Sequence, residues 1–272
     1  METELWLPSV DVRPTVALRL VCLGHAGSGA APYLRWAAAL PERVGLCAVR
    51  RPGREAAFRE PLLRDVPSMA AGTMDALSTL PARPTVLFGH SLGAAIAFAV
   101  ARRMEAMNAG PVLLIVSAHG PVHMPSQTPR LAALPNAEFI EAIEHTYGGI
   151  PPEILREPEL LQMLLPVLRA DITASESYRA PPRPPLRCPI LVSFGTHDQT
   201  VDPRTLDAWG ELTTGPVELA PYEGGHFYVF EEPRFLSDLH RRLEALLVEL
   251  VELVSPRGPS PTEPQTPTSR VV

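Results

Sequence analysis

Apolar and polar positions divide this chain into two kinds of segment that alternate. Short aliphatic and β-branched runs predict buried strands, and they occupy residues 15–23, 44–49, 85–88, 112–117, 190–194 and 217–219. Longer segments with helical periodicity lie between them, at residues 33–40, 67–80, 92–107, 203–212 and 233–253. Because strands and helices alternate, the pattern predicts an α/β fold with a mostly parallel sheet and helices on both faces.

The alternation breaks once, between the fourth and fifth predicted strands. About 70 residues separate these strands, and they include two helical patterns at 137–145 and 157–171, joined by the breaker Gly-Gly-Ile-Pro-Pro at 148–152. We therefore expect a single domain over residues 1–254 with a helical lid inserted at about 121–185. The tail that follows is rich in Pro, Ser and Thr and has no apolar face, so residues 255–272 are expected to be disordered.

Composition narrows the possible partners. The 272 residues are 46% hydrophobic with a net charge of -6, which permits a large core and gives no general attraction to nucleic acid or anionic lipid. Residues 1–12 lack the apolar core of a signal peptide, and charged residues interrupt every run before the roughly 18 residues of a membrane span. Cys22, Cys47 and Cys188 match no metal motif, and their odd number argues against a disulfide framework. We expect a cytoplasmic protein that binds neither nucleic acid nor membrane.

A candidate nucleophile lies between a predicted strand and a small-residue helix. Residues 89–93 read Gly-His-Ser-Leu-Gly, the G-x-S-x-G pattern of a nucleophile elbow. The flanking glycines let two backbone segments pack around a serine in a strained turn, and the following helix offers N–H groups and a positive dipole end. G-x-S-x-G also arises by chance, but a strand before it and a helix after it favour the elbow. Ser91 is therefore the predicted nucleophile.

A serine hydroxyl at neutral pH needs a general base, and His226 is the predicted one. It follows the last predicted strand, and Gly224 and Gly225 allow its loop to bend toward Ser91. The order Ser, acid, His along the chain is that of the α/β-hydrolase fold. Six of the other seven histidines are expected to lie at the surface or to pack, with two on helices (His145, His240), two in loops (His119, His123) and two beside the site (His25, His90).

The acid that orients the base should follow a strand end between the serine and the histidine. The predicted strand at 190–194 leads directly into Asp198, whereas no carboxylate follows closely after the strand at 112–117. Asp202 is the alternative, but it immediately precedes Pro203 and suits the cap of the next helix. Asp198 is therefore the predicted acid.

An oxyanion hole needs two backbone N–H donors. The first is predicted at Leu92, directly after the nucleophile, and the second at Ala26, in the early loop Gly-His-Ala-Gly-Ser-Gly at 24–29. The alternative is that this loop is an ordinary glycine-rich connection. It lacks the G-K-[ST] end of a P-loop and the spacing of a dinucleotide fingerprint.

Five motifs together resemble the type II thioesterases of polyketide and nonribosomal peptide biosynthesis. They are His-Ala-Gly at 25–27, Arg-Pro-Gly-Arg-Glu at 51–55, the elbow, Leu-Pro-Val-Leu-Arg-Ala-Asp at 165–171 and Gly-Gly-His-Phe-Tyr at 224–228. The resemblance implies a stand-alone editing enzyme that hydrolyses aberrant or stalled acyl thioesters on the phosphopantetheine arm of an acyl or peptidyl carrier protein. It implies a triad of Ser91, Asp198 and His226, and no metal or other cofactor.

The chain departs from the family pattern at two places. The acid loop reads Gly-Thr-His-Asp-Gln at 195–199 where the family commonly has Gly-Asp-x-Asp-Pro, so only the second acid is kept. The early loop reads Ala-Gly-Ser-Gly at 26–29 instead of the usual Ala-Gly-Gly, which changes its expected geometry.

Other functions stay open at this point. A chain-releasing thioesterase or acyltransferase acting in trans and a small-molecule carboxylesterase would use the same triad, whereas a purely binding hydrolase fold would have a broken one. Few residues precede the first strand and no Asp-Ser-Leu attachment site occurs, so we expect a carrier to bind in trans.

Acyl-chain contacts and carrier docking are less constrained by the sequence. Apolar lid positions are expected either to line an acyl chamber or to pack against the core, and they are Phe139, Tyr147, Leu161, Leu164 and Leu168. Arginines near the site are expected either to guide an acidic carrier or to be solvated surface charges, and they are Arg35, Arg51 and Arg54.

Overall fold

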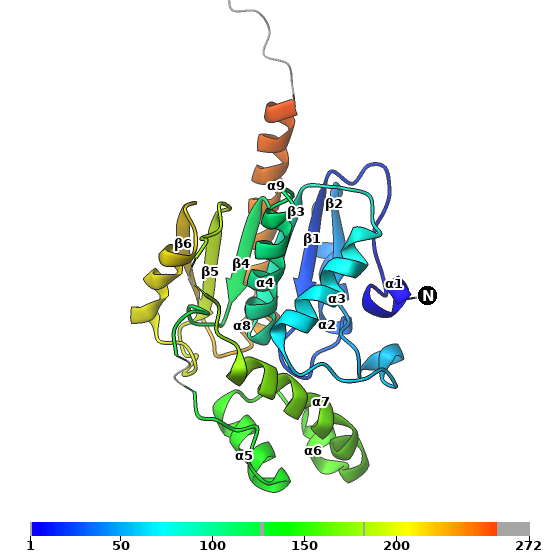
Figure 1. The fold of residues 1–272 in the computed structure, drawn as a ribbon, viewed down its shortest axis with the longest axis vertical. Helices are drawn as coiled ribbons and strands as arrows, with labels where there is room; N and C mark the ends of the chain where they lie inside the picture. Colours follow the sequence, from blue (N-terminus) through cyan, green and yellow to red (C-terminus); the bar gives the residue numbers. More distant parts are fainter. Residues whose placement is uncertain (1, 126–127, 182, 255–272) are drawn as a thin grey trace, which may run out of the picture.

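The central layer is a six-stranded parallel sheet (Figure 1). The computed structural model describes residues 2–125, 128–181 and 183–254. The strands lie in the order β2-β1-β3-β4-β5-β6, and each pair of neighbours is parallel. Their bounds are β1 Leu18–Leu23, β2 Val44–Ala48, β3 Thr85–His90, β4 Leu113–Ser117, β5 Ile190–Gly195 and β6 Val217–Tyr222. The predicted α/β-hydrolase class, with its parallel sheet, is confirmed.

Alternating residues of each central strand feed two separate cores. In β1, Leu20 and Cys22 join the cluster on one face of the sheet, whereas Val21 and Leu23 join the cluster on the other. This alternation follows from the two-residue period of a strand. Because both faces are covered, β1 is buried along its whole length, while the edge strand β6 is half-exposed.

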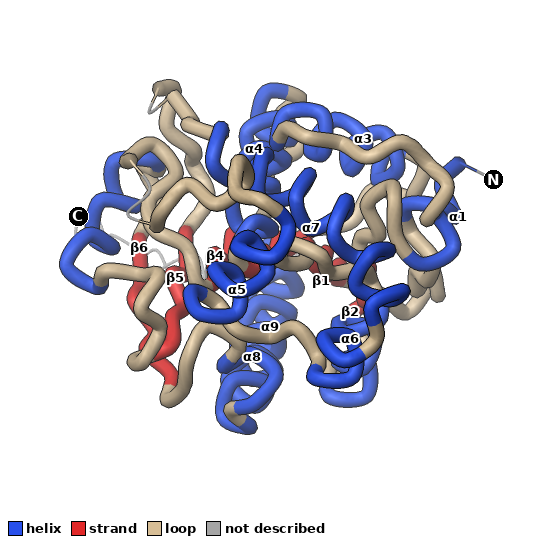
Figure 2. Tube along the Cα trace, turned by 90° about the horizontal axis from the view of Figure 1, so that it is seen from below, coloured by secondary structure: helices blue, strands red, loops and turns tan. Residues whose placement is uncertain are grey.

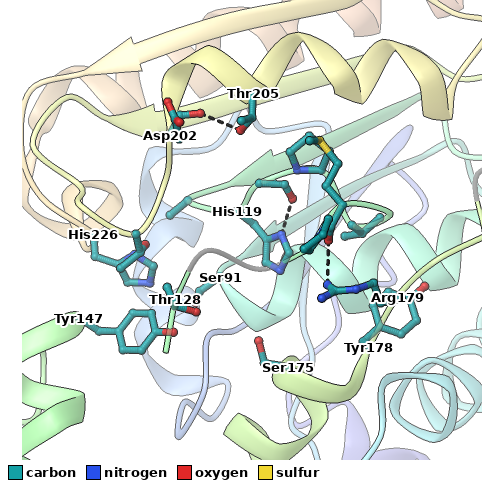
Figure 3. Close-up of a pocket in the computed structure, with 17 residues that line it drawn as sticks. Ser91, His119, Thr128, Tyr147, Ser175, Tyr178, Arg179, Asp202, Thr205 and His226 are labelled. Carbon is teal, nitrogen blue, oxygen red and sulfur yellow. Dashed lines mark hydrogen bonds between the residues drawn. The ribbon is translucent and has the colours of Figure 1, made fainter. Parts of the chain in front are cut away.

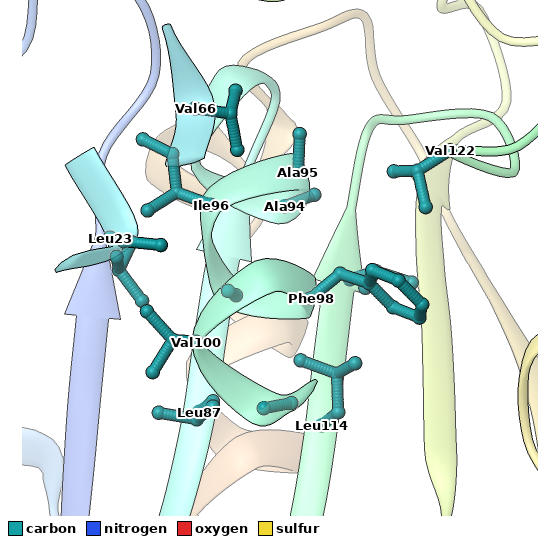
Figure 4. Close-up of a cluster of buried hydrophobic side chains, with 14 of the residues drawn as sticks. Leu23, Val66, Leu87, Ala94, Ala95, Ile96, Phe98, Val100, Leu114 and Val122 are labelled. Carbon is teal, nitrogen blue, oxygen red and sulfur yellow. The ribbon is translucent and has the colours of Figure 1, made fainter. Parts of the chain in front are cut away.

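Helices cover both faces of the sheet (Figure 1). On one face, α3 (Val66–Ser78), α4 (Leu92–Ala106) and the 3-10 helix η3 (Pro203–Leu212) pack over the first cluster. Figure 4 shows Ile96, Phe98 and Val100 of α4 among strand side chains that include Leu87 and Leu114. On the other face lie α2 (Ala31–Leu34), the 3-10 helix η1 (Arg35–Ala39) and α9 (Pro233–Val254).

Two predicted helices differ from the observed ones in detail. The helix expected at 33–40 consists of two short pieces, α2 and η1, and the segment at 203–212 is a 3-10 helix. The short elements α1 (Glu2–Trp6), η2 (Glu55–Ala57) and α8 (Tyr228–Glu231) were not predicted, because pieces this small carry no helical period.

The described part of the long segment between β4 and β5 contains three helices. They are α5 (Asn136–Thr146), α6 (Pro152–Arg156) and α7 (Pro158–Ser177), and Figures 1 and 2 show them across the carboxyl end of the sheet. Helix α6 was not predicted, because the prolines before it suggest a breaker; proline is tolerated in its first turn. These helices share a small apolar cluster of their own, which includes Phe139, Ile143 and Leu168.

The tail at 255–272, predicted to be disordered, lies outside the described residues. Within the described ranges, no helix is both long and apolar enough to span a membrane. Cys22, Cys47 and Cys188 are buried free thiols.

Candidate active site

The sheet topology places the first site loops side by side. Strand order reverses at β1, because β2 lies on one side of it and β3 on the other. Ligand sites of open parallel sheets form at the carboxyl ends of strands at such a switch point. The loop at 24–29 follows β1 and Ser91 follows β3, so the predicted oxyanion loop lies beside the predicted nucleophile.

Ser91 is held in a strained turn between β3 and α4. Its backbone has φ 55° and ψ -123°, a conformation that residues other than glycine rarely adopt. Its N–H donates to Ser117 O at 2.8 Å. A Cβ on Gly93 would lie 2.0 Å from Leu23 O, and a Cβ on Gly89 would lie 2.1 Å from Gly93 O. Both glycines of the motif are therefore required by backbone contact.

His226 and Asp198 form a buried pair. Nδ1 of His226 is 2.8 Å from Oδ2 of Asp198, with the two side chains 4% and 1% exposed. A carboxylate only accepts hydrogen bonds, so Nδ1–H donates to it and Nε2 is left as the basic nitrogen. Burial opposes the charge of Asp198, but hydrogen bonds from His226 and Thr200 outweigh it and hold the pKa of this carboxyl below its usual value.

Thr200 is a part of this pair that sequence reasoning missed. Its N–H and Oγ1 both donate to Oδ1 of Asp198, at 2.9 and 2.7 Å. The spacing Asp198-Gln199-Thr200 allows this local turn, so the signal was present in the sequence.

A neutral histidine lies directly behind the site. The His90 ring is 5.2 Å from the His226 ring, and its Nδ1 is 2.9 Å from Ser117 Oγ, which is 2.7 Å from the Tyr228 hydroxyl. Burial lowers the pKa of His90 well below its usual value, and burial also lowers the pKa of His25 to about 3. These side chains pack against the site, as predicted, without placing a second positive charge beside His226.

Two cavities meet at the nucleophile. Ser91, Tyr147, Ser175 and His226 line both of them. The larger cavity has a volume of about 340 Å³ and is lined mainly by apolar groups from the loop at 24–29 and from α5 and α7, with Ile143, Leu164, Leu168, Ile172 and Phe227 among them. The smaller one, of about 90 Å³, has more polar groups, with His119, Thr128, Arg179, Asp202 and Thr205 among them (Figure 3).

Three of the five predicted acyl-contact residues lie at the larger cavity. Tyr147, Leu164 and Leu168 line it, and the Tyr147 ring also contacts the His226 ring edge-to-face at 5.1 Å. Phe139 is fully buried under the Arg169 guanidinium, 4.2 Å from its ring centre. Neither Phe139 nor Leu161 is among the described residues that line the two cavities.

The predicted oxyanion donors also lie at the larger cavity. Ala26 and Leu92 both line it, together with Ser91. Leu92 is the first residue of α4, so its N–H has no acceptor within the helix. The structure thus brings the predicted nucleophile, base and both donors to one cavity, with Asp198 behind the base.

Asp202 has the capping role that the sequence favours. It precedes η3, and its carboxylate accepts from the N–H of Arg204 at 3.0 Å and pairs with the Arg204 guanidinium.

Two of the three arginines considered for carrier docking are interior residues. Arg51 and Arg54 are only 1% and 6% exposed, and both pair with the buried Asp171. Both expectations for these two arginines, docking of a carrier and solvated surface charge, are therefore wrong. Asp171 lies on α7, distant in sequence from both arginines. Arg35 is exposed, as expected.

Among the described residues, no cluster of three or more His, Cys, Asp or Glu side chains is arranged to hold a metal ion.

Comparison with known proteins places this arrangement in a family. The family model of the thioesterase domain matches residues 18–243, which includes the elbow, Asp198 and His226. The chain belongs to the thioesterase family.

The chain is similar to curated thioesterases and biosynthesis proteins and to a solved type II thioesterase. The gramicidin S biosynthesis protein GrsT of Aneurinibacillus migulanus is 31% identical over 231 residues, covering 85% of this chain and 90% of that protein. Thioesterase PikA5 of Streptomyces venezuelae is 34% identical over 236 residues, covering 85% and 83%. The structure of the type II thioesterase BorB from the borrelidin biosynthetic cluster has a TM-score of 0.77 at 35% identity and covers 88% of this chain and 98% of that chain. The predicted resemblance to type II thioesterases is confirmed.

Proposed function

We propose that this thioesterase hydrolyses stalled or aberrant acyl thioesters from the phosphopantetheine arm of an acyl or peptidyl carrier protein, with Ser91, Asp198 and His226 as its triad. The observation that carries the proposal is the position of Ser91, in a strained elbow where two cavities meet beside His226. The relatives named above support the biosynthetic setting. The buried free cysteines support a reducing, cytoplasmic compartment.

The chemistry proceeds in two halves. Nε2 of His226 takes the Ser91 proton as Oγ attacks the thioester carbonyl, and the tetrahedral intermediate collapses when the C–S bond breaks. The departing sulfur takes the proton from His226 and leaves as the free pantetheine thiol. Water then attacks the acyl-serine with His226 again as base, and the products are a carboxylic acid and free Ser91.

Two backbone donors stabilise the charge that forms on the carbonyl oxygen. They are the N–H groups of Ala26, in the loop after β1, and of Leu92, directly after Ser91, and both residues line the same cavity as Ser91. Such fixed donors act mainly on the transition state, where the oxygen is negative.

The contrast between the cavities supports a division of the substrate. The larger, apolar cavity suits the acyl chain, because burying its methylene groups is favourable. The smaller, more polar cavity suits the amide-rich pantetheine arm, because polar groups there can replace the water that the arm loses. We therefore assign the acyl group to the side of α5 and α7 and the arm to the side of Arg179.

The test is hydrolysis of an acyl-carrier thioester by the wild type and by Ser91→Ala. We expect the variant to lose at least about a thousandfold in kcat while its circular dichroism stays unchanged. Full hydrolysis by the folded variant would falsify the assignment of Ser91. An oxygen ester with the same acyl group tests the carboxylesterase alternative. Faster turnover of the ester than of the carrier thioester would indicate a carboxylesterase.

A chain-releasing thioesterase or acyltransferase is separated by its products. Hydrolysis yields the free acid from any of several short acyl carriers, whereas release by cyclisation or transfer yields a lactone, lactam or ester. Mass analysis of the product from a hydroxyacyl carrier distinguishes them.

A further inference from the structure

Two sequence motifs take no part in the chemistry described so far, yet they meet inside the molecule. Asp171 ends the motif at 165–171 on α7, and its carboxylate is completely buried. It accepts from Arg51 Nη2 at 3.0 Å and from Arg54 at 2.9 and 3.1 Å, and both arginines belong to the motif at 51–55 after β2. A cluster of three buried charges, which we name the Arg-Arg-Asp cluster, therefore joins α7 to the sheet domain.

The same cluster holds the loop that carries Ala26. Oδ2 of Asp171 accepts from the Gly27 N–H at 2.8 Å. Arg51 donates to Gly24 O at 2.9 Å and to His25 O at 2.8 Å. Nη1 of Arg54 also donates to the backbone carbonyl of Ser28, at 3.2 Å. The loop is thus fastened immediately before and immediately after Ala26.

The geometry of this loop depends on these bonds. Gly27 has φ 77°, a conformation available at low cost only to glycine, so its N–H direction is set by the backbone and by its acceptor. Asp171 fixes the Gly27 N–H and thus the peptide plane after Ala26. The Ala26 N–H belongs to the preceding peptide plane, whose His25 carbonyl accepts from Arg51. The cluster therefore holds the peptide planes on both sides of Ala26.

Stability alone is a weak reason for such a cluster. Two arginines and one aspartate leave an excess positive charge in the interior, and the Nε atoms of Arg51 and Arg54 have no hydrogen-bond partner among the described residues. Buried ion pairs seldom stabilise a fold more than apolar side chains of the same volume. Burial opposes the ionisation of Asp171, but Arg51 and Arg54 outweigh it and hold its pKa below the usual value, so the acceptor stays charged.

We infer that Asp171, with Arg51 and Arg54, is a positioning residue that aims the Ala26 N–H at the oxyanion and makes this donor dependent on the seating of α7. The inference rests on the proposed function, because it needs Ala26 as an oxyanion donor. Since the loop acts on the transition state, loosening it lowers kcat and leaves substrate binding largely unchanged.

The experiment compares Asp171→Asn with Glu176→Gln, using an acyl-N-acetylcysteamine thioester. Glu176 lies on the same helix and also accepts backbone N–H groups, from Leu131 and Ala132. Among the described residues, no hydrogen bond or ion pair of Glu176 reaches the loop at 24–29. We expect Asp171→Asn to lower kcat roughly 10- to 100-fold with KM within about twofold, somewhat less than the loss of a whole oxyanion donor. Glu176→Gln should stay within about threefold of the wild type in both parameters.

A second readout separates positioning from a loose fold. An alkylboronic acid binds a serine hydrolase as an oxyanion mimic, so its inhibition constant should rise in parallel with the fall in kcat for Asp171→Asn and stay constant for Glu176→Gln. Arg51→Lys keeps the positive charge but cannot reach Gly24 O and His25 O together, and the same kcat loss is expected there. Arg51→Lys also tests the positioning role if Asp171→Asn does not fold.

The outcomes distinguish this inference from the function on which it rests. Unchanged kcat in Asp171→Asn, equal losses in the two helix variants, or a rise in KM alone would overturn it. A wild type that hydrolyses no acyl thioester would instead overturn the proposed function.

Discussion

At the scale of single residues, the elbow shows how little freedom the backbone leaves. Ser91 reaches its positive φ because Gly89 and Gly93 remove the side chains that would collide with neighbouring carbonyl groups. Strain of this kind is maintained only when the surrounding contacts over-determine the conformation.

The first prediction concerns Gly93. Gly93→Ala places a methyl group 2.0 Å from Leu23 O, a backbone atom of the central strand that cannot move aside. We expect a loss of about 3 kcal/mol or more in the free energy of unfolding, measured by urea denaturation. Gly210→Ala is the matched control, because a Cβ there meets no heavy atom within 4 Å; equal losses in the two variants would show that the close contact has no effect.

Residues that could be predicted from the sequence are those whose role follows from chain order. Ser91, Asp198 and His226 follow the ends of β3, β5 and β6, and parallel strands bring such ends to one edge of the sheet. Asp171 could not be given a role in this way, because its bond to the Gly27 N–H spans 144 positions and nothing local in either segment announces it.

At the scale of elements, α7 serves two neighbours at once. Its Leu164 and Leu168 line the apolar cavity, while Asp171 faces the loop after β1. The helix runs through Pro166 without ending.

The second prediction uses the cavity face of α7. Leu164→Trp adds volume to the wall of the apolar cavity, so we expect kcat/KM to fall more for an octanoyl thioester than for an acetyl one. The ratio of the octanoyl to the acetyl kcat/KM should be about tenfold lower in the variant than in the wild type. Leu160→Trp is the control, because this leucine of the same helix is 45% exposed and is not among the cavity-lining residues. A parallel loss for both chain lengths would mean that this cavity does not hold the acyl group.

Element boundaries show where the sequence pattern stops being informative. The cores of the six strands were predicted, because buried parallel strands are apolar on both faces. Strand β6 continues to Tyr222, beyond its predicted end, because an edge strand can carry exposed polar positions that hide its period. The predicted lid boundaries remain a prediction, although three helices do lie in that segment.

At the scale of the whole molecule, stability depends on keeping buried histidines neutral. Burial lowers the pKa of His90 well below the usual value of about 6.5, with the nearby His226 and His25 as smaller contributions of the same sign. As the pH falls below about 6.5, the unfolded chain binds a proton at this residue while the folded protein does not. The folded state is therefore favoured above this pH and loses stability as the pH falls.

The third prediction follows from that sign. Below about pH 6, His90 should contribute a loss of up to about 1.4 kcal/mol per pH unit to the free energy of unfolding. His90→Asn should reduce the slope of the free energy of unfolding against pH by the same amount, measured by urea denaturation at each pH. The same slope in both proteins would assign the dependence to other groups.

The meeting of two cavities at Ser91 also orders events in time. With the acyl group in the apolar cavity and the arm in the polar one, as we propose, departure of the thiol empties the polar side and leaves the apolar side filled. The next molecule to reach the acyl-serine must enter by the path that the leaving group has just opened. Hydroxyl and charged groups line this passage, so water enters it readily once it is empty. The polar lining of the vacated passage therefore favours water as the second nucleophile.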